Sequence, residues 1–154
     1  MESVKNDNEI FDEALSKLFY YLKSHQTWKS ITDKANVDID RTSLTILHII
    51  LKSKKSLRVN DIARILEIEA PSVSRKVGRL EETHLIKRII NEEDKRSAYF
   101  KVTKKAEEID KKMRTCRQNI SMSILKNWND KDRKSLVNLF NKFVEDLINN
   151  QKGI

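Results

Sequence analysis

Residues that break helices or cross-link a chain are scarce in this sequence. Its 154 residues include one cysteine, one proline and two glycines. Because proline and glycine interrupt helices, their scarcity predicts long helices joined by short polar turns. The single cysteine, Cys116, excludes an intrachain disulfide and fits a reducing compartment.

Long apolar runs are missing as well. A helix that crosses a membrane needs about 18 consecutive apolar residues. The longest apolar patch here, residues 46–51, is interrupted by His48. The N-terminus has no signal-peptide pattern. We therefore expect a cytoplasmic protein with no membrane partner.

The residue constellations of enzymes and metal sites are absent. The sequence has no glycine-rich phosphate loop, no nucleophile motif and no pair of cysteines at CxxC spacing. His25, His48 and His84 are scattered, with no second ligand three or four residues away. We predict that the protein is not an enzyme and has neither a metal site nor a cofactor.

Cysteine can sense oxidants and tryptophan can bind an effector, but we assign both residue types here to packing. Cys116 falls on an apolar helical stripe between Met113 and Ile120, where a buried thiol is inert, so we predict packing rather than oxidant sensing. Trp28 and Trp128 are assigned to the core or to a dimer interface rather than to an effector crevice.

The charge is positive and unevenly distributed. The net charge is +8, yet residues 1–40 carry 5 Lys and Arg against 8 Asp and Glu, and the rest carries 26 against 15. A basic body favours an acidic polymer such as nucleic acid, or an anionic membrane surface. Basic charge alone also describes many well-solvated proteins.

Hydrophobic periodicity predicts a mainly α-helical fold with a small β-hairpin. A strong amphipathic helix is expected over residues 8–25. Asp40 is expected to cap a second helix, and two shorter helices follow, the later one opening around Pro71. The β-rich runs 85–90 and 97–102 flank a polar tip. Thr103 and Asn129 are expected to cap the last two helices, the first of about 24 residues.

The helix that opens around Pro71 carries the strongest functional pattern. Val73, Val77 and Leu80 form one apolar stripe, which turns the cations of this helix outward. Hydroxyl groups and the backbone N–H groups at a helix N-terminus can bind phosphate, and arginine can form two hydrogen bonds with guanine. This face therefore fits a DNA major groove. The charged hairpin tip Asp94-Lys95-Arg96 fits the neighbouring minor groove. Together these elements predict a winged helix-turn-helix.

Several segments, in this order and spacing, resemble the MarR family of bacterial transcription regulators over nearly the whole chain. The segments are Val59-Asn60-Asp61-Ile62-Ala63, Ser72-Val73-Ser74-Arg75 with Leu80-Glu81-Glu82, Leu85-Ile86-Lys87-Arg88, Glu93-Asp94-Lys95-Arg96-Ser97 and Val102-Thr103. The sequence departs from the family pattern where Glu69 replaces a capping hydroxyl and where His84 and Ala106 replace glycines. A left-handed turn at His84 would be energetically unfavourable.

The resemblance implies a homodimer that binds a pseudo-palindromic double-stranded operator, usually as a repressor. Residues 41–103 would be the DNA-binding part, and residues 1–40 and 104–154 the helical dimerisation part. Arg96 would enter the minor groove, positioned by Asp94, while Lys95 contacts phosphate. A small-molecule effector, often aromatic or anionic, would bind in a crevice between the two parts. The major-groove residues would be Ser72, Ser74, Arg75, Lys76 and Arg79.

The predicted apolar surface of the outer helices independently favours a dimer, because a monomer would leave it exposed. Two other functions fit the same fold. One is a winged-helix module that binds a protein partner, for which apolar or acidic anchors would be expected on the free helix face. The other is an architectural DNA binder without sequence preference, which would show salt dependence but no specificity ratio.

Overall fold

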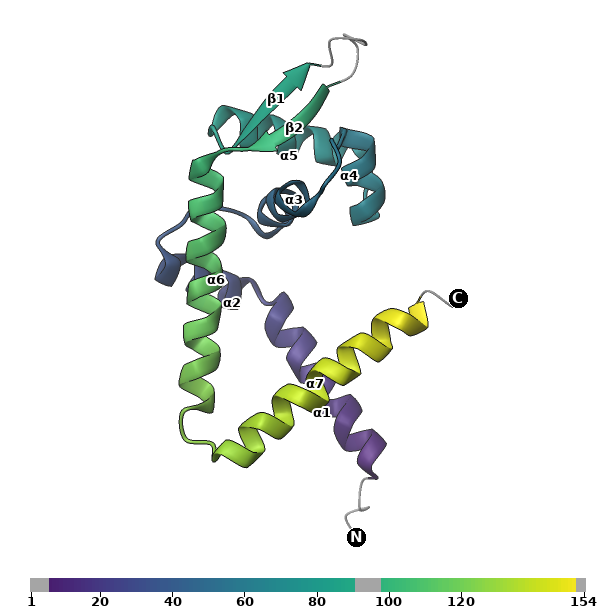
Figure 1. Cartoon of the computed structure of the whole chain (residues 1–154), viewed down its shortest axis with the longest axis vertical. Coiled ribbons are helices and arrows are strands. Elements are labelled where there is room, and N and C mark those ends of the chain that lie inside the picture. The colour runs from purple at the N-terminus through teal and green to yellow at the C-terminus, as the bar shows by residue number, and fades with distance from the viewer. Residues whose placement is uncertain (1–5, 91–97, 152–154) are drawn as a thin grey trace. The chain divides into compact units, whose positions relative to one another are not determined.

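A computed structural model describes residues 6–90 and 98–151 (Figure 1). The described chain is mainly α-helical with one antiparallel hairpin, which confirms the predicted fold class. No helix in these ranges is both long and apolar enough to cross a membrane. The elements in chain order are α1 (Asp7–Lys23), α2 (His25–Ala35), α3 (Arg41–Lys52), α4 (Val59–Leu66), α5 (Ala70–Glu82), β1 (Ile86–Ile90), β2 (Ala98–Val102), α6 (Lys104–Leu125) and α7 (Asp130–Gln151).

The helix α2 was not predicted, and the expected single helix over residues 8–25 is divided at Ser24. The Ser24 N–H donates to the carbonyl oxygens of Tyr20 and Tyr21, and the Ser24 hydroxyl accepts from the N–H of Thr27 at 3.4 Å. One residue therefore ends α1 and caps α2. The inward side of α2 carries two buried threonines, so its apolar periodicity is weak.

Contacts divide the chain into two units, one ending at Cys116 and one beginning at Arg117. In the first unit, α3 packs on α5 and β2, and α5 packs on α4 and β1. The side chains that fill this core are almost fully inaccessible to solvent, and the largest are Ile46, Leu47, Ile62, Met113, Val73 and Val77. This core fixes the orientation of α5.

The hairpin has the predicted strands. Arg88 of β1 pairs with Phe100 of β2, whose ring is buried, and the Arg88 guanidinium lies 5.4 Å from the ring centroid. The same guanidinium forms two hydrogen bonds, of 3.0 and 2.9 Å, with the carboxylate of Glu81 in α5. The pKa of Arg88 is raised, chiefly by this hydrogen bonding. The hairpin is thereby attached to α5. The predicted tip residues Asp94, Lys95 and Arg96 lie outside the described residues.

A left-handed residue, His84, joins α5 to the hairpin, although its Cβ atom makes this conformation unfavourable. The φ angle of His84 is 59°. The His84 carbonyl oxygen accepts from the Thr103 hydroxyl at 2.9 Å, and that hydroxyl also accepts from the Ala106 N–H at 3.3 Å. Thr103 therefore caps α6, as predicted, while holding the end of α5.

Replacing His84 with glycine is expected to stabilise the protein by about 0.5–1 kcal/mol, because glycine adopts a positive φ without a Cβ clash. The hydrogen bond to the His84 carbonyl oxygen does not depend on the side chain and is retained. Urea unfolding measures the change. The control is Glu82→Gly, inside α5, which should destabilise the protein by a similar amount. Equal destabilisation by both substitutions would contradict the argument.

The second unit begins within α6 and contains α7. The Asn129 side chain accepts from the Asp132 N–H at 2.9 Å, which confirms the predicted cap. No described side chain of residues 117–150 is buried. Several large apolar side chains of this unit are at least 39% exposed, including Leu136, Val137, Leu139, Phe140, Leu147 and Ile148. Because most of the stability of a helix in a protein comes from the packing of its apolar face, α7 needs a partner surface.

Candidate nucleic-acid interface

The helix α5 has the predicted buried and outward sides. Val73 and Val77 are 0% exposed and Leu80 is 3% exposed, which confirms the apolar stripe. Pro71 lies in the first turn, where its missing N–H needs no partner. Glu69 is the N-cap residue but its side chain makes no capping hydrogen bond. The backbone supplies this function, since the Glu69 carbonyl oxygen accepts from the Ser72 N–H at 3.0 Å.

Two arginines dominate the outward face of α5. Arg75 and Arg79 are exposed and four residues apart, so they lie on the same side of the helix. Within residues 6–90 and 98–150, no carboxylate forms an ion pair with either guanidinium. Ser74 is exposed, whereas Ser72 is half-buried. This face therefore presents two uncompensated positive charges and hydroxyl groups near the helix start.

The structure places Lys76 differently from the two arginines. Its Nζ lies 3.0 Å from Oδ2 of Asp40, the N-cap residue of α3. Asp40 also accepts from the Ser43 N–H at 3.0 Å and from the Ser43 hydroxyl at 2.7 Å, as expected for the predicted cap. Lys76 thus connects α5 to α3. Sequence periodicity placed Lys76 near the free face but gave no sign of this partner.

These contacts change the pKa of the Asp40 carboxyl group. Partial burial raises the pKa of Asp40, but the hydrogen bonds from Ser43, followed by the interaction with Lys76, outweigh that effect and lower the pKa below 3.8. Asp40 therefore remains ionised at neutral pH, and its charge holds Lys76.

The pKa shift of Asp40 predicts the direction of a pH effect on folding. A carboxyl group with a lowered pKa in the folded state stabilises that state above its unfolded pKa, and the stabilisation is lost as pH falls through the folded value. Wild type should therefore exceed Asp40→Asn in free energy of unfolding at pH 7. The difference should shrink as pH falls below about 3.8. Urea unfolding at a series of pH values measures it, and a constant difference would contradict the assignment.

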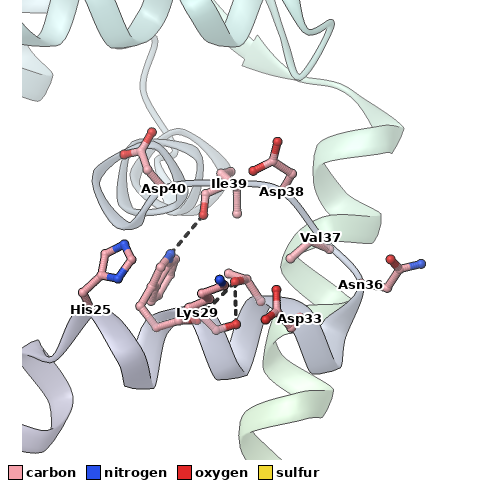
Figure 2. Close-up of a pocket in the computed structure, with 10 residues that line it drawn as sticks. His25, Lys29, Asp33, Asn36, Val37, Asp38, Ile39 and Asp40 are labelled. Atoms are coloured by element: carbon pink, nitrogen blue, oxygen red, sulfur yellow. Dashed lines mark hydrogen bonds between the residues drawn. The ribbon is translucent and has the colours of Figure 1, made fainter.

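A pocket of about 890 Å³ lies between α2 and the segment of residues 36–40 that leads into α3 (Figure 2). The indole Nε1–H of Trp28 donates to the Ile39 carbonyl oxygen at 3.0 Å, so this ring ties the pocket wall to α3. The Arg41 guanidinium lies 4.9 Å from the Trp28 ring centroid and donates to the Leu22 and Ser24 carbonyl oxygens. Trp28 packs against the core, as predicted, but its ring also lines this pocket, which the prediction had not assigned to it.

The lining of this pocket is polar and richer in carboxylates than in cations. Three aspartates contribute to it, against one lysine, and these residues are Asp33, Asp38, Asp40 and Lys29. Asp40 is already held by Ser43 and Lys76. The side chain of Asn36, a left-handed residue that ends α2, points away from the labelled cluster (Figure 2).

A buried carboxylate connects α3 to α6. Asp110 is 5% exposed. Its two oxygens lie 3.4 Å from His48 Nδ1 and 3.1 Å from an Arg114 nitrogen. Sequence analysis gave these residues no role. The long helix is thereby attached to the winged helix-turn-helix through a satisfied polar contact.

Cys116 is only half-buried, so the prediction that it is buried is wrong. Its thiol donates to the Ile31 carbonyl oxygen at 3.6 Å, and this contact between α6 and α2 supports a packing role. Across the described residues, no three His, Cys, Asp or Glu side chains are placed to hold a metal ion.

Comparisons with known proteins agree with this geometry. Residues 37–97 match the model of the MarR family. The HTH-type transcriptional regulator YwoH of Bacillus subtilis is 27% identical over 126 residues, which are 79% of this chain and 90% of YwoH. A MarR family protein from Bacillus stearothermophilus shares the fold with a TM-score of 0.74 at 18% identity, covering 94% of this chain and 99% of that one.

A third relative has been solved with DNA. A MepR variant of Staphylococcus aureus bound to an oligodeoxyribonucleotide has a TM-score of 0.64 at 21% identity, covering 86% of this chain and 97% of that one. Because this structural similarity covers 86% of the chain, the shared fold includes residues outside the matched range 37–97. The chain is therefore similar to the MarR family over residues 37–97, and it shares its fold with solved proteins of that family over most of its length.

Proposed function

We propose that the protein is a dimeric, sequence-specific DNA-binding regulator that represses transcription until a small-molecule effector releases it. The outward face of α5 carries this proposal. Arg75 and Arg79 are exposed there and form no ion pair with any residue that the structure describes, and the buried stripe on the opposite side packs the helix against the core. Arginine recognises guanine through two parallel hydrogen bonds, which suits a helix that lies in the major groove.

The remaining contacts follow from the helix start and from the hairpin. Ser72 and Ser74 face phosphate or base edges near the N-terminus of α5, where the helix dipole favours anions. β1 ends at Ile90 and β2 begins at Ala98, and residues 91–97, which join them in the sequence, are proposed to form the wing tip. Within this segment Arg96 is proposed to enter the minor groove. Asp94 positions that arginine, and Lys95 binds a neighbouring phosphate.

The dimer follows from the exposed apolar side chains of the outer helices. Both α1 and α7 carry several, including Phe19 at 51% and Leu139 at 68% exposure. We assign residues 41–103 to DNA binding and residues 1–40 and 104–154 to dimerisation with a second copy. Two-fold symmetry would place two α5 helices about 34 Å apart, one turn of DNA. The operator is accordingly pseudo-palindromic.

The effector site is assigned to the pocket that Trp28 and Ile39 line. Its wall joins α2 to the first turn of α3, the helix whose cap residue Asp40 holds Lys76 of α5. A ligand that displaces the segment of residues 36–40 would therefore reach the DNA-binding helix through one ion pair. Trp28 supplies an aromatic surface for a planar ligand. MepR has itself been solved with ethidium bromide bound.

The test is fluorescence anisotropy with the protein's own upstream intergenic DNA and a scrambled duplex, at two salt concentrations. A preference of about a thousandfold or more indicates a specific operator. Arg75→Ala and Arg79→Ala should each weaken operator binding by about 1–3 kcal/mol and relax the specificity. Arg117→Ala, an exposed arginine of α6, is the control and should leave the binding unchanged.

Each other outcome favours a different function. Equal and steeply salt-dependent binding to both duplexes would indicate an architectural DNA binder. No binding at low salt would indicate a module that binds a protein partner. Unchanged affinity in both arginine variants would contradict the assignment of α5. A reporter fused to the upstream region should become active on deletion of the gene if the regulator is a repressor.

A further inference from the structure

A second basic surface lies outside the outward face of α5. The chain has no carboxylate between Asp40 and Asp61, and this stretch contains the turn that follows α3. Lys54 and Lys55 stand exposed on that turn. The Ser53 hydroxyl donates to the Lys55 carbonyl oxygen at 2.8 Å and accepts from the Lys55 N–H at 3.1 Å, which holds the turn in shape.

The fold brings a strand of the hairpin to this turn. A pocket of about 370 Å³ is lined by Lys54 and Lys55 from the turn and by Tyr99 and Lys101 from β2. Among the described residues of its lining, Glu107 is the one carboxylate. Three lysines and a tyrosine thus line the same pocket. Nothing in the sequence shows that residues 54–55 meet residues 99–101.

A fourth lysine adds to the same charge. Lys87 of β1 is the cross-strand partner of Lys101. Such pairs have Cβ atoms about 4.5–5.5 Å apart, and like charges in this position destabilise a sheet. We call Lys54, Lys55, Lys87 and Lys101 the lysine cluster. Within the described ranges no carboxylate forms an ion pair with any of these four side chains. The repulsion is relieved when an anion binds between these side chains.

We propose that the lysine cluster binds phosphate groups of the DNA backbone, as a contact separate from α5 and from the hairpin tip. This inference rests on the proposed function. Lysine serves as a compact positive charge for phosphate, whereas base recognition favours flat groups with fixed geometry. Lys87 and Lys101 lie on the two strands of the hairpin, whose tip is proposed to reach the minor groove. Its contribution is affinity without sequence information.

The test compares salt dependence of DNA binding in two double variants. Lys54→Gln with Lys55→Gln removes two charges of the cluster from each protomer, and Lys111→Gln with Lys112→Gln removes two exposed charges from α6. Anisotropy titrations with the upstream duplex and the scrambled duplex over a range of KCl give the slope of log Kobs against log salt. Each lost phosphate contact flattens this slope by about 0.9. One contact per protomer therefore flattens it by about two in the dimer.

The expected result is a flatter slope and weaker binding for the cluster variant on both duplexes, with an unchanged ratio between them. The α6 variant should match wild type, and Lys54→Arg with Lys55→Arg should retain the wild-type slope. An unchanged slope in the glutamine variant overturns the proposal. A slope of the arginine variant that is flatter than that of wild type also overturns it. A changed ratio between duplexes also overturns it, because the cluster would then read bases. Wild-type protein that binds neither duplex would instead refute the proposed function itself.

Discussion

Replacing Leu139 and Phe140 with aspartate should leave a monomer that binds its operator at least about a hundredfold more weakly than wild type. Both side chains are exposed on α7, at 68% and 48%, and no described side chain of their unit is buried. A charge on each position would have to be desolvated in the proposed dimer interface. A monomer then loses the effective concentration that links two half-site contacts, a gain typically worth a factor of 10²–10⁴.

Sedimentation equilibrium measures the dimer, and anisotropy on the upstream duplex measures the binding. The control is Asn138→Asp with Asn149→Asp, which adds the same charge to the same helix. By helical periodicity these two positions lie on the side of α7 away from Leu139 and Phe140. The control protein should remain a dimer. If both variants dissociate, general repulsion explains the loss. If neither does, the dimer lies elsewhere.

Features set by neighbours in the sequence were predictable. The stripe of Val73, Val77 and Leu80 follows from helical spacing, because a helix brings residues three and four apart to one side. The caps at Asp40, Thr103 and Asn129 follow from side-chain oxygens that reach backbone N–H groups three residues on. The hairpin follows from two β-rich runs around a polar tip. Each of these signals spans only a few residues.

Features set by tertiary contacts were not predictable. The ion pair of Lys76 with Asp40 joins residues that periodicity treats separately, and so does the meeting of Lys54 with Lys101. The helix α2 escaped prediction because its inward side is partly made of threonine, with Thr32 bonding back to the carbonyl oxygens of Trp28 and Lys29. Its Ser24 cap and the spacing of Trp28, Ile31 and Ala35 are the signals that would have revealed it.

The position of α5 depends on the buried side chains of the core, so a core substitution in α4 should destabilise the protein. Ile62→Ala should lower the free energy of unfolding by about 2–5 kcal/mol, because Ile62 is 0% exposed and its loss leaves a cavity. Ile65→Ala is the same chemical change on the same helix, but Ile65 is 53% exposed and should change stability by no more than about 0.5 kcal/mol. Urea unfolding measures both. Equal losses would show that solvent exposure does not distinguish the two positions. The expected difference would show that the buried side chain of Ile62 stabilises the packing of α4 on α5, so the proposed DNA-binding face depends on a residue that lies in the core.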